Sequence, residues 1–237
     1  GIFEVAGNRY SKSYLFSDVN YNTTSEAEQV GIFESYCKFL NAMDVEFKIT
    51  INNKNRNMRS LREKVLFQKK GDGNDAERGC YNQIMEKKIM EGKQGIEQER
   101  YLTVSIIRKN YEEAKAAFAS LEAVLQKGFG ELGSSLVTLN GVERLRTLHD
   151  FYRMGEEEYF SFDFEEAVRV SRDYKDDICN SMLKFYPTYM QDEKRYAKAL
   201  FIKKYPSSLS DRFLTELATV PAHTIISIDV APIPKDV

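Results

Sequence analysis

Alternation of apolar and polar residues predicts four strands in the first two thirds of the chain. Residues 10–21 combine aromatic and small side chains in a loose alternation, which favours a strand. From Val45 to Ile51 the alternation is strict, so we predict a half-buried strand there. Residues 101–108 and 134–139 have the composition of two further strands.

Two helices are predicted between these strands. The first carries an apolar stripe at three- to four-residue spacing, formed by Val30, Phe33, Cys37 and Leu40. Residues 23–25 can cap it, and Glu26 and Glu28 place negative charge in its first turn, where the helix dipole favours it. The second helix covers residues 111–127, with Asn110 as its cap.

The order strand, helix, strand thus occurs twice, which predicts an α+β protein with a ferredoxin-like split β-α-β sheet. Between the two units, residues 52–99 are rich in Lys, Arg, Glu and Gly and are too polar for a core. They predict an inserted helical hairpin with helices over 56–67 and 74–91 and a turn at 71–73. A short helix over 141–154 follows the fourth strand.

The remainder of the chain predicts a smaller β-β-α-β group, which is either a second sub-domain or part of one composite sheet. Its elements are two strands over 182–191 and 195–204, a helix from 211 capped by Ser208 or Ser210, and a strand over 224–230. The predicted organisation is an N-terminal sub-domain 8–155 with an insertion at about 53–98, a connector 156–178, a second sub-domain 179–232 and a linker beginning at 233–237.

Charge gives no general attraction to nucleic acid or to membranes, because 34 basic and 36 acidic residues leave a formal charge of −2. The best local basic cluster lies in the hairpin and consists of Lys54, Arg56, Arg59, Arg62, Lys64, Lys69 and Lys70. It is either a solvated helical surface or a contact for a phosphate backbone or an anionic membrane. Phe67 is the one aromatic residue nearby, so base stacking is not indicated.

The familiar catalytic motifs are missing or misplaced. Residues 128–133 match G-x-G-x-x-G, but a helix precedes them and a strand follows, which is the reverse of the dinucleotide-binding order. We expect Gly128 to end the helix instead. The sequence holds no P-loop, and His149 and His223 lack partners at metal-ligand spacing. We therefore predict no catalytic, cofactor-binding or metal-binding residue.

An acidic and aromatic run follows Gly155. Phe160, Phe162 and Phe164 alternate with polar residues, which predicts an extended connector with one aromatic face on the protein body. The same strip could dock a partner. A metal-dependent hydrolase using the acidic residues of 156–166 is the less favoured alternative, because hard-cation sites draw carboxylates from separate elements.

The C-terminal part of the chain also carries a family resemblance. It contains, in order, Tyr174-Lys-Asp-Asp-Ile, Phe201-Ile-Lys-Lys-Tyr-Pro, Leu209-Ser-Asp-Arg-Phe-Leu-Thr-Glu-Leu and Ile228-Asp-Val-Ala-Pro. This segment resembles the one ahead of the motor domain in VirB-type (TrbE/CagE-like) ATPases of type IV secretion and conjugation, particularly those of Gram-positive conjugative elements. The earlier Leu139-Asn-Gly-Val-Glu-Arg-Leu and Leu148-His-Asp-Phe-Tyr fit the same family.

The resemblance implies a non-catalytic N-terminal domain that docks a motor to inner-membrane channel proteins and helps order its oligomer. ATP and Mg would be bound by a downstream motor domain, and this chain itself would hold no cofactor. The expected location is the cytoplasm, at the inner face of the cell membrane. Three well-separated cysteines fit free thiols in a reducing compartment. The alternative function is a nucleic-acid-binding module of a mobile genetic element, using the basic hairpin 54–70.

Overall fold

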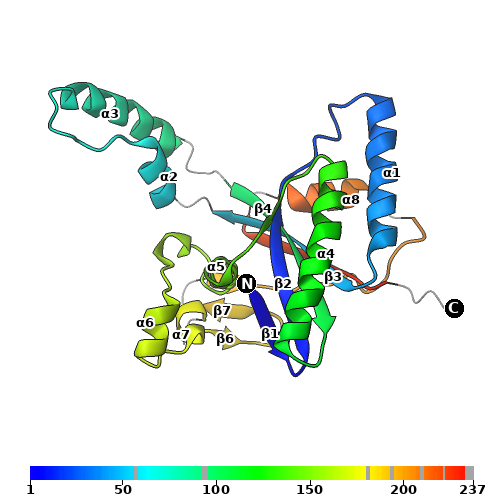
Figure 1. The fold of residues 1–237 in the computed structure, drawn as a ribbon. Coiled ribbons are helices and arrows are strands. Elements are labelled where there is room, and N and C mark those ends of the chain that lie inside the picture. Colours follow the sequence, from blue (N-terminus) through cyan, green and yellow to red (C-terminus); the bar gives the residue numbers. More distant parts are fainter. Residues whose placement is uncertain are drawn as a thin grey trace. The chain divides into compact units, whose positions relative to one another are not determined.

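The computed structural model describes residues 1–55, 58–91, 96–179, 182–192, 195–208, 211–220 and 222–232 (Figure 1). They form two compact units. The sheet unit comprises Gly1–Asn52, Gln98–Arg144 and Ile225–Val237, and the second unit comprises Asn53–Glu97 and Leu145–Thr224. Arg56 and the predicted linker 233–237 lie outside the described residues.

A six-stranded antiparallel sheet forms the sheet unit. Its strands are β1 (Ile2–Ala6), β2 (Arg9–Phe16), β3 (Glu46–Asn55), β4 (Ile96–Ile107), β5 (Leu136–Thr138) and β9 (Thr224–Val230). Their order is β1-β2-β4-β3-β9, and β5 also pairs with β2. Because β1 pairs with residues 9–12 of β2 and β5 with residues 14–16, these two strands share one edge of β2.

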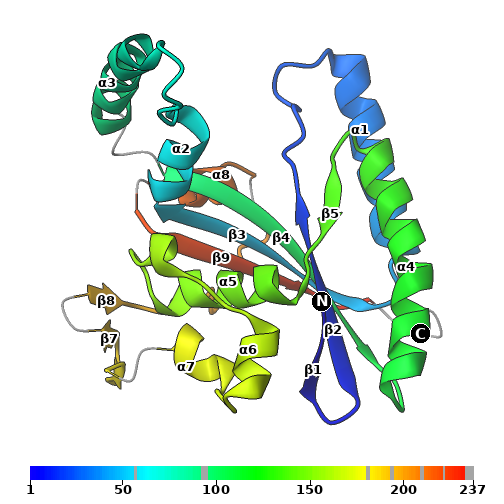
Figure 2. The ribbon, with the colours of Figure 1, turned by 60° about the vertical axis from the view of Figure 1, so that its left-hand side comes forward.

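The core of this unit lies between one sheet face and two helices, α1 (Glu26–Ala42) and α4 (Tyr111–Glu131). The two helices run side by side along the sheet (Figure 2). Tyr14 of β2 stands opposite Leu102 of β4 in the sheet and shares its buried face. Both are almost completely buried, as are Phe118 and Leu125 of α4. Large apolar side chains thus fill the space between sheet and helices.

The predicted helix caps of this unit are confirmed. Ser25 caps α1 in a capping box with Glu28, and Asn110 caps α4 by accepting a hydrogen bond from the backbone of Glu113. The predicted apolar stripe of α1 is only partly right. Val30 and Phe33 are exposed, and the buried residue of the helix is Phe39, because α1 turns a neighbouring stripe toward the core.

Gly128 is the point where α1 and α4 approach closely. An added Cβ at Gly128 would lie 2.5 Å from Cδ2 of Phe39, whose ring also contacts Phe129 with centroids 5.2 Å apart. The prediction that Gly128 ends the helix is wrong. The helix continues to Glu131, and Gly133, with φ of +75°, adopts the left-handed conformation that follows it.

The hairpin of β1 and β2 was not predicted from the sequence. Gly7 and Asn8 form its turn, and Asn8 has a positive φ of 62°, which asparagine tolerates better than most residues. Arg144 holds the hairpin from one side. Its guanidinium donates hydrogen bonds to the carbonyl oxygens of Gly1 at 3.0 Å and Ser11 at 2.7 Å.

The second unit contains short elements and a long helical hairpin. The hairpin helices are α2 (Met58–Val65) and α3 (Asp75–Glu91), which confirms the two helices predicted here. The other elements are the C-terminal part of α5 (Gly141–Tyr152), η1 (Glu157–Tyr159), α6 (Phe164–Arg169), α7 (Tyr174–Ile178), β6 (Lys184–Phe185), β7 (Met190–Asp192), β8 (Arg195–Ala197) and α8 (Asp211–Ala218).

Three predictions for this part of the chain are wrong. Strand 224–230 does not belong to a β-β-α-β group, because β9 pairs with β3 in the large sheet. The predicted strand 182–191 is divided into β6 and β7 by a turn in which the backbone NH of Tyr186 donates to the carbonyl of Tyr189. Residues 198–204 are not a strand. A three-stranded sheet of order β6-β7-β8 results.

The acidic and aromatic run is not an extended connector. It forms η1 and then α6, because Asp163 caps α6 by accepting hydrogen bonds from the backbone NH groups of Glu165 and Glu166. A capped helix start outweighs the alternation of phenylalanines that suggested a strand. The predicted cap Ser210 of α8 lies outside the described residues.

Candidate interaction surface

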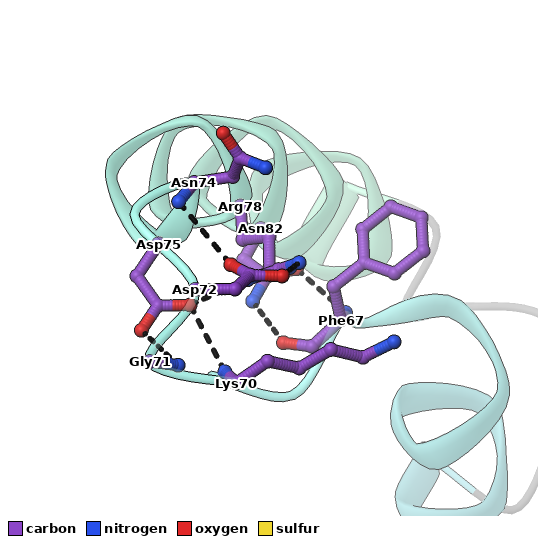
Figure 3. Close-up of polar contacts among 8 residues, drawn as sticks. All are labelled: Phe67, Lys70, Gly71, Asp72, Asn74, Asp75, Arg78 and Asn82. Atoms are coloured by element: carbon purple, nitrogen blue, oxygen red, sulfur yellow. Dashed lines mark hydrogen bonds and ion pairs between the residues drawn. The ribbon is translucent and has the colours of Figure 1, made fainter.

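The loop that joins α2 to α3 is held by side chains rather than by a core (Figure 3). The guanidinium of Arg78 donates to both carboxylate oxygens of Asp72, at 2.5 and 2.6 Å, and to Asp75 at 2.7 Å. Asn82 closes the loop, since its amide donates to the carbonyl of Phe67 and its oxygen accepts from the backbone NH of Phe67. These contacts fix the loop without burying apolar surface.

The two loop carboxylates are stabilised in their charged form. The hydrogen bond from Arg78 is the main cause that lowers the pKa of Asp72. The pKa of Asp75 is lowered first by the backbone NH of Lys70 and then by Arg78. The guanidinium of Arg78 already pairs with the carboxylates of Asp72 and Asp75. These two residues therefore stabilise the loop between α2 and α3 and do not form an open cation site.

The structure separates the basic residues predicted as one patch. Lys54 is buried, so its assignment to an exposed patch is wrong. Its Nζ lies 2.8 Å from Oδ2 of Asp150. Arg59 pairs with Glu63 at 3.2 Å on the same helix, and Arg62 reaches Glu86 of α3 at 3.2 Å. Acidic partners thus partly neutralise the predicted basic cluster.

Lys54 belongs to a buried polar cluster of the second unit. Asp150, its partner, also faces His149, with 3.4 Å between Nδ1 of His149 and Oδ1 of Asp150. Both ring nitrogens of His223 are shielded from solvent and have no hydrogen-bond partner within the described part of the chain. Burial is the main cause that lowers the pKa of His223, while the carboxylates of Glu157 and Asp150 oppose it.

The three predicted aromatic contacts have different surroundings. The ring of Phe160 lies 5.1 Å from the ring of His149, centroid to centroid, and Phe162 is buried beside Phe164 at 4.9 Å. Phe164 is exposed. Of the predicted aromatic strip, Phe160 and Phe162 therefore take part in internal packing, and Phe164 remains available on the surface.

The largest exposed apolar side chains of the second unit were not singled out from the sequence. In the small sheet, Phe185 and Tyr196 are 74% and 66% exposed. Tyr196 stands opposite Gln191 in the β7–β8 ladder, so the two share a face, whereas Met190 and Ala197 share the opposite face. Met190 and Ala197 line a cavity beside Tyr152. The Tyr196 face is therefore the outer one.

The segment after β8 carries the two most exposed large apolar side chains among the residues that the structure describes. We call residues 198–205, with the sequence KALFIKKY, the apolar–basic segment. Leu200 and Phe201 are 82% and 85% exposed, and Ile202 and Tyr205 are also exposed. The sequence carries no local signal of this exposure, because three apolar residues in succession are usually buried. We instead predicted a strand here.

Among the described residues, no group of His, Cys, Asp and Glu side chains could hold a metal ion. The cavity beside Tyr152 has a volume of about 10 Å³ and is lined mainly by Phe151, Tyr152, Met154 and Met190. A hollow of that size holds about one water molecule. In the same described ranges, no helix is long and apolar enough to span a membrane.

Comparison with known proteins adds no relative. No protein-family model matches the chain, and no curated protein is significantly similar to it.

Proposed function

We propose that this chain is a non-catalytic docking domain. The observation that carries the proposal is the exposure of Phe185, Tyr196, Leu200 and Phe201 within one short stretch of the second unit. Large apolar side chains grouped on a surface are typical of interaction sites, whereas scattered single residues need no explanation. Aromatic residues are also the side chains most enriched in protein interfaces.

The more specific proposal is that the chain is the N-terminal part of a conjugative transfer ATPase of the type IV secretion class. It is supported by the residues of the C-terminal part that resemble this family, and by the sheet topology. Strands β5, β2, β4 and β3 lie in the order of a ferredoxin-like split β-α-β sheet, with α1 and α4 on one face. In addition, β1 and β9 extend that sheet.

In this proposal the chain has no catalytic role. ATP and Mg would act in a motor domain of the parent protein, and the surface of the second unit would contact inner-membrane channel proteins at the cytoplasmic face of the membrane. The alternative, nucleic-acid binding by hairpin 54–70, is less well supported. Arg59 and Arg62 already have acidic partners and Lys54 is buried, which leaves less charge for a phosphate backbone.

Co-purification with the inner-membrane channel proteins of its own transfer operon tests the docking proposal. Phe185→Asp with Tyr196→Asp replaces the two most exposed aromatic side chains of the small sheet with charges, one on each face, and we expect at least a tenfold loss of captured channel protein. Phe33→Asp is the matched control, because Phe33 is 60% exposed but lies on α1 of the sheet unit. Capture that is absent in the unchanged chain, or lost equally in the control, would refute the proposal.

A further inference from the structure

The apolar–basic segment has a composition different from the rest of the exposed surface. Leu200, Phe201 and Ile202 form an apolar centre, with Lys198 before it and Lys203 and Lys204 after it. Tyr205 follows at the end. From residue 194 to residue 210 the sequence contains no acidic side chain. An exposed apolar centre is therefore flanked on both sides by positive charge alone.

The structure leaves this segment open to solvent. All eight of its residues are exposed, and it is irregular rather than helical or extended in a sheet. Among the described residues, Lys198, Lys203 and Lys204 have no ion-pair partner. This distinguishes them from Arg59 and Arg62 of the hairpin, which are paired with Glu63 and Glu86. The charge of the segment is therefore available to an external anion.

We propose that residues 198–205 bind the surface of an anionic lipid bilayer. Leu200 and Phe201 would enter the boundary between head groups and acyl chains, where burial of apolar area drives interfacial binding. The three lysines would place their ammonium groups among the anionic head groups, while their alkyl stems cover apolar surface. Tyr205 is the kind of side chain that is enriched at this boundary.

Charge and shape both favour a membrane over an acidic protein. A protein interface needs a fixed, complementary surface around its apolar anchors, whereas Leu200 and Phe201 stand 82% and 85% exposed in an irregular segment. A bilayer surface needs no such complementarity. This inference adds a lipid contact to the proposed membrane-proximal location, and it uses residues other than Phe185 and Tyr196 of the protein-docking test.

A single tryptophan can report the insertion directly, because the chain contains none. We would prepare Phe201→Trp and, as a matched control, Val168→Trp, since Val168 of α6 is 80% exposed. Each protein is mixed with vesicles of phosphatidylcholine alone and of equal parts phosphatidylcholine and phosphatidylglycerol. We expect a blue shift of the emission for Phe201→Trp with the anionic vesicles, and none for Val168→Trp.

Charge variants separate electrostatic attraction from non-specific adhesion. Near an anionic membrane each lysine contributes a factor of about five to binding, so Lys203→Gln with Lys204→Gln should weaken vesicle sedimentation about 25-fold. Lys69→Gln with Lys70→Gln removes two neighbouring, exposed lysines from the hairpin loop and should change binding little. Binding by the unchanged chain should weaken as salt increases.

Four results would overturn the inference. They are no sedimentation with anionic vesicles, equal binding to neutral vesicles, an equal loss in the hairpin control, and a blue shift of Phe201→Trp with channel protein in the absence of lipid. The last result would assign the segment to a protein contact. The proposed docking function is judged separately, because co-purification with Phe185→Asp and Tyr196→Asp uses no vesicle and leaves residues 198–205 unchanged.

Discussion

The two units of this protein differ in what they bury. The core of the sheet unit is apolar and is built from side chains such as Tyr14, Leu102 and Phe118. The second unit buries charge, since Lys54, His149, Asp150 and Glu157 are all nearly inaccessible to solvent. Apolar cores stabilise a fold without specific partners, whereas buried ionic groups stabilise it only when each group is satisfied.

The units also differ in where their exposed apolar side chains lie. Those of the sheet unit, such as Val5, Phe33 and Ile107, belong to separate elements. In the second unit, four side chains that are about two thirds or more exposed lie within residues 185–201, namely Phe185, Tyr196, Leu200 and Phe201. Apolar area that could have strengthened the core of the second unit is thus placed on its outside. This difference is the reason why we propose the second unit, and not the sheet unit, as the contact surface.

The largest expected effect is in the core of the sheet unit. Phe118→Ala removes a fully buried ring and leaves a cavity, so the free energy of unfolding should fall by about 3–5 kcal/mol. Phe201→Ala makes the same chemical change at an exposed site and should alter it by less than about 0.5 kcal/mol. Urea unfolding followed by circular dichroism measures both, and similar losses would contradict the contrast between the units.

The buried ion pair of the second unit should be nearly as sensitive. Asp150→Asn keeps the shape of the side chain but removes the carboxylate 2.8 Å from Lys54, which should cost about 3 kcal/mol. Glu63→Gln breaks the exposed pair with Arg59 and should cost less than about 1 kcal/mol. If the two variants unfold at the same urea concentration, the buried pair is not a main element of this unit.

A smaller effect is expected where α1 and α4 meet. Gly128→Ala forces a methyl group against the ring of Phe39, whereas an added Cβ at Gly130 of the same helix has no atom within 4 Å. Since both changes gain the same helix propensity, their difference should be about 1–3 kcal/mol from overpacking alone. Chemical denaturation of the two variants measures this difference. Equal stabilities would contradict the close approach of Gly128 in α4 to Phe39 in α1.

The smallest effect concerns pH. Burial lowers the pKa of His223 in the folded chain below its unfolded value of about 6.5. Between these two pKa values the unfolded chain binds more protons, so stability should rise with pH there and fall on acidification below about 6.5. Protonation of Asp72 and Asp75 should also lower the stability of the folded chain, but only below about pH 4. His223→Phe should flatten the plot of unfolding free energy against pH near pH 6. An unchanged slope would show that the titration of His223 does not cause the pH dependence.

Local signals predicted the elements of the sheet unit well. Ser25 and Asn110 are capping residues, and each is followed by an acidic first turn of a helix. The strict alternation from Val45 to Ile51 indicates a half-buried strand. The helical hairpin was also predictable, because a polar stretch with a Gly-Asp-Gly turn has no place in a core. Each of these features depends on residues that are close together in the chain, so it can be recognised from a single sequence.

Long-range pairing and exposure could not be predicted in the same way. Nothing within Thr224–Val230 shows that β9 pairs with β3 rather than with the adjacent small sheet. Lys54 was assigned to a basic patch because its partner Asp150 is 96 residues away in the sequence. The exposure of Leu200 and Phe201 was likewise missed, since apolar residues in succession are usually buried. Tertiary context decides each of these cases.

Hydrogen–deuterium exchange of the chain, alone and with the inner-membrane channel proteins that we propose as its partners, tests the proposed docking role of the second unit most directly. We expect added protection in the small sheet, residues 182–192 and 195–197. Exchange in α1 and in the α2–α3 hairpin should stay unchanged, and residues 198–205 should be protected only when anionic vesicles are present. Protection confined to the hairpin or to α1, with none in the small sheet, would contradict a docking role of the second unit.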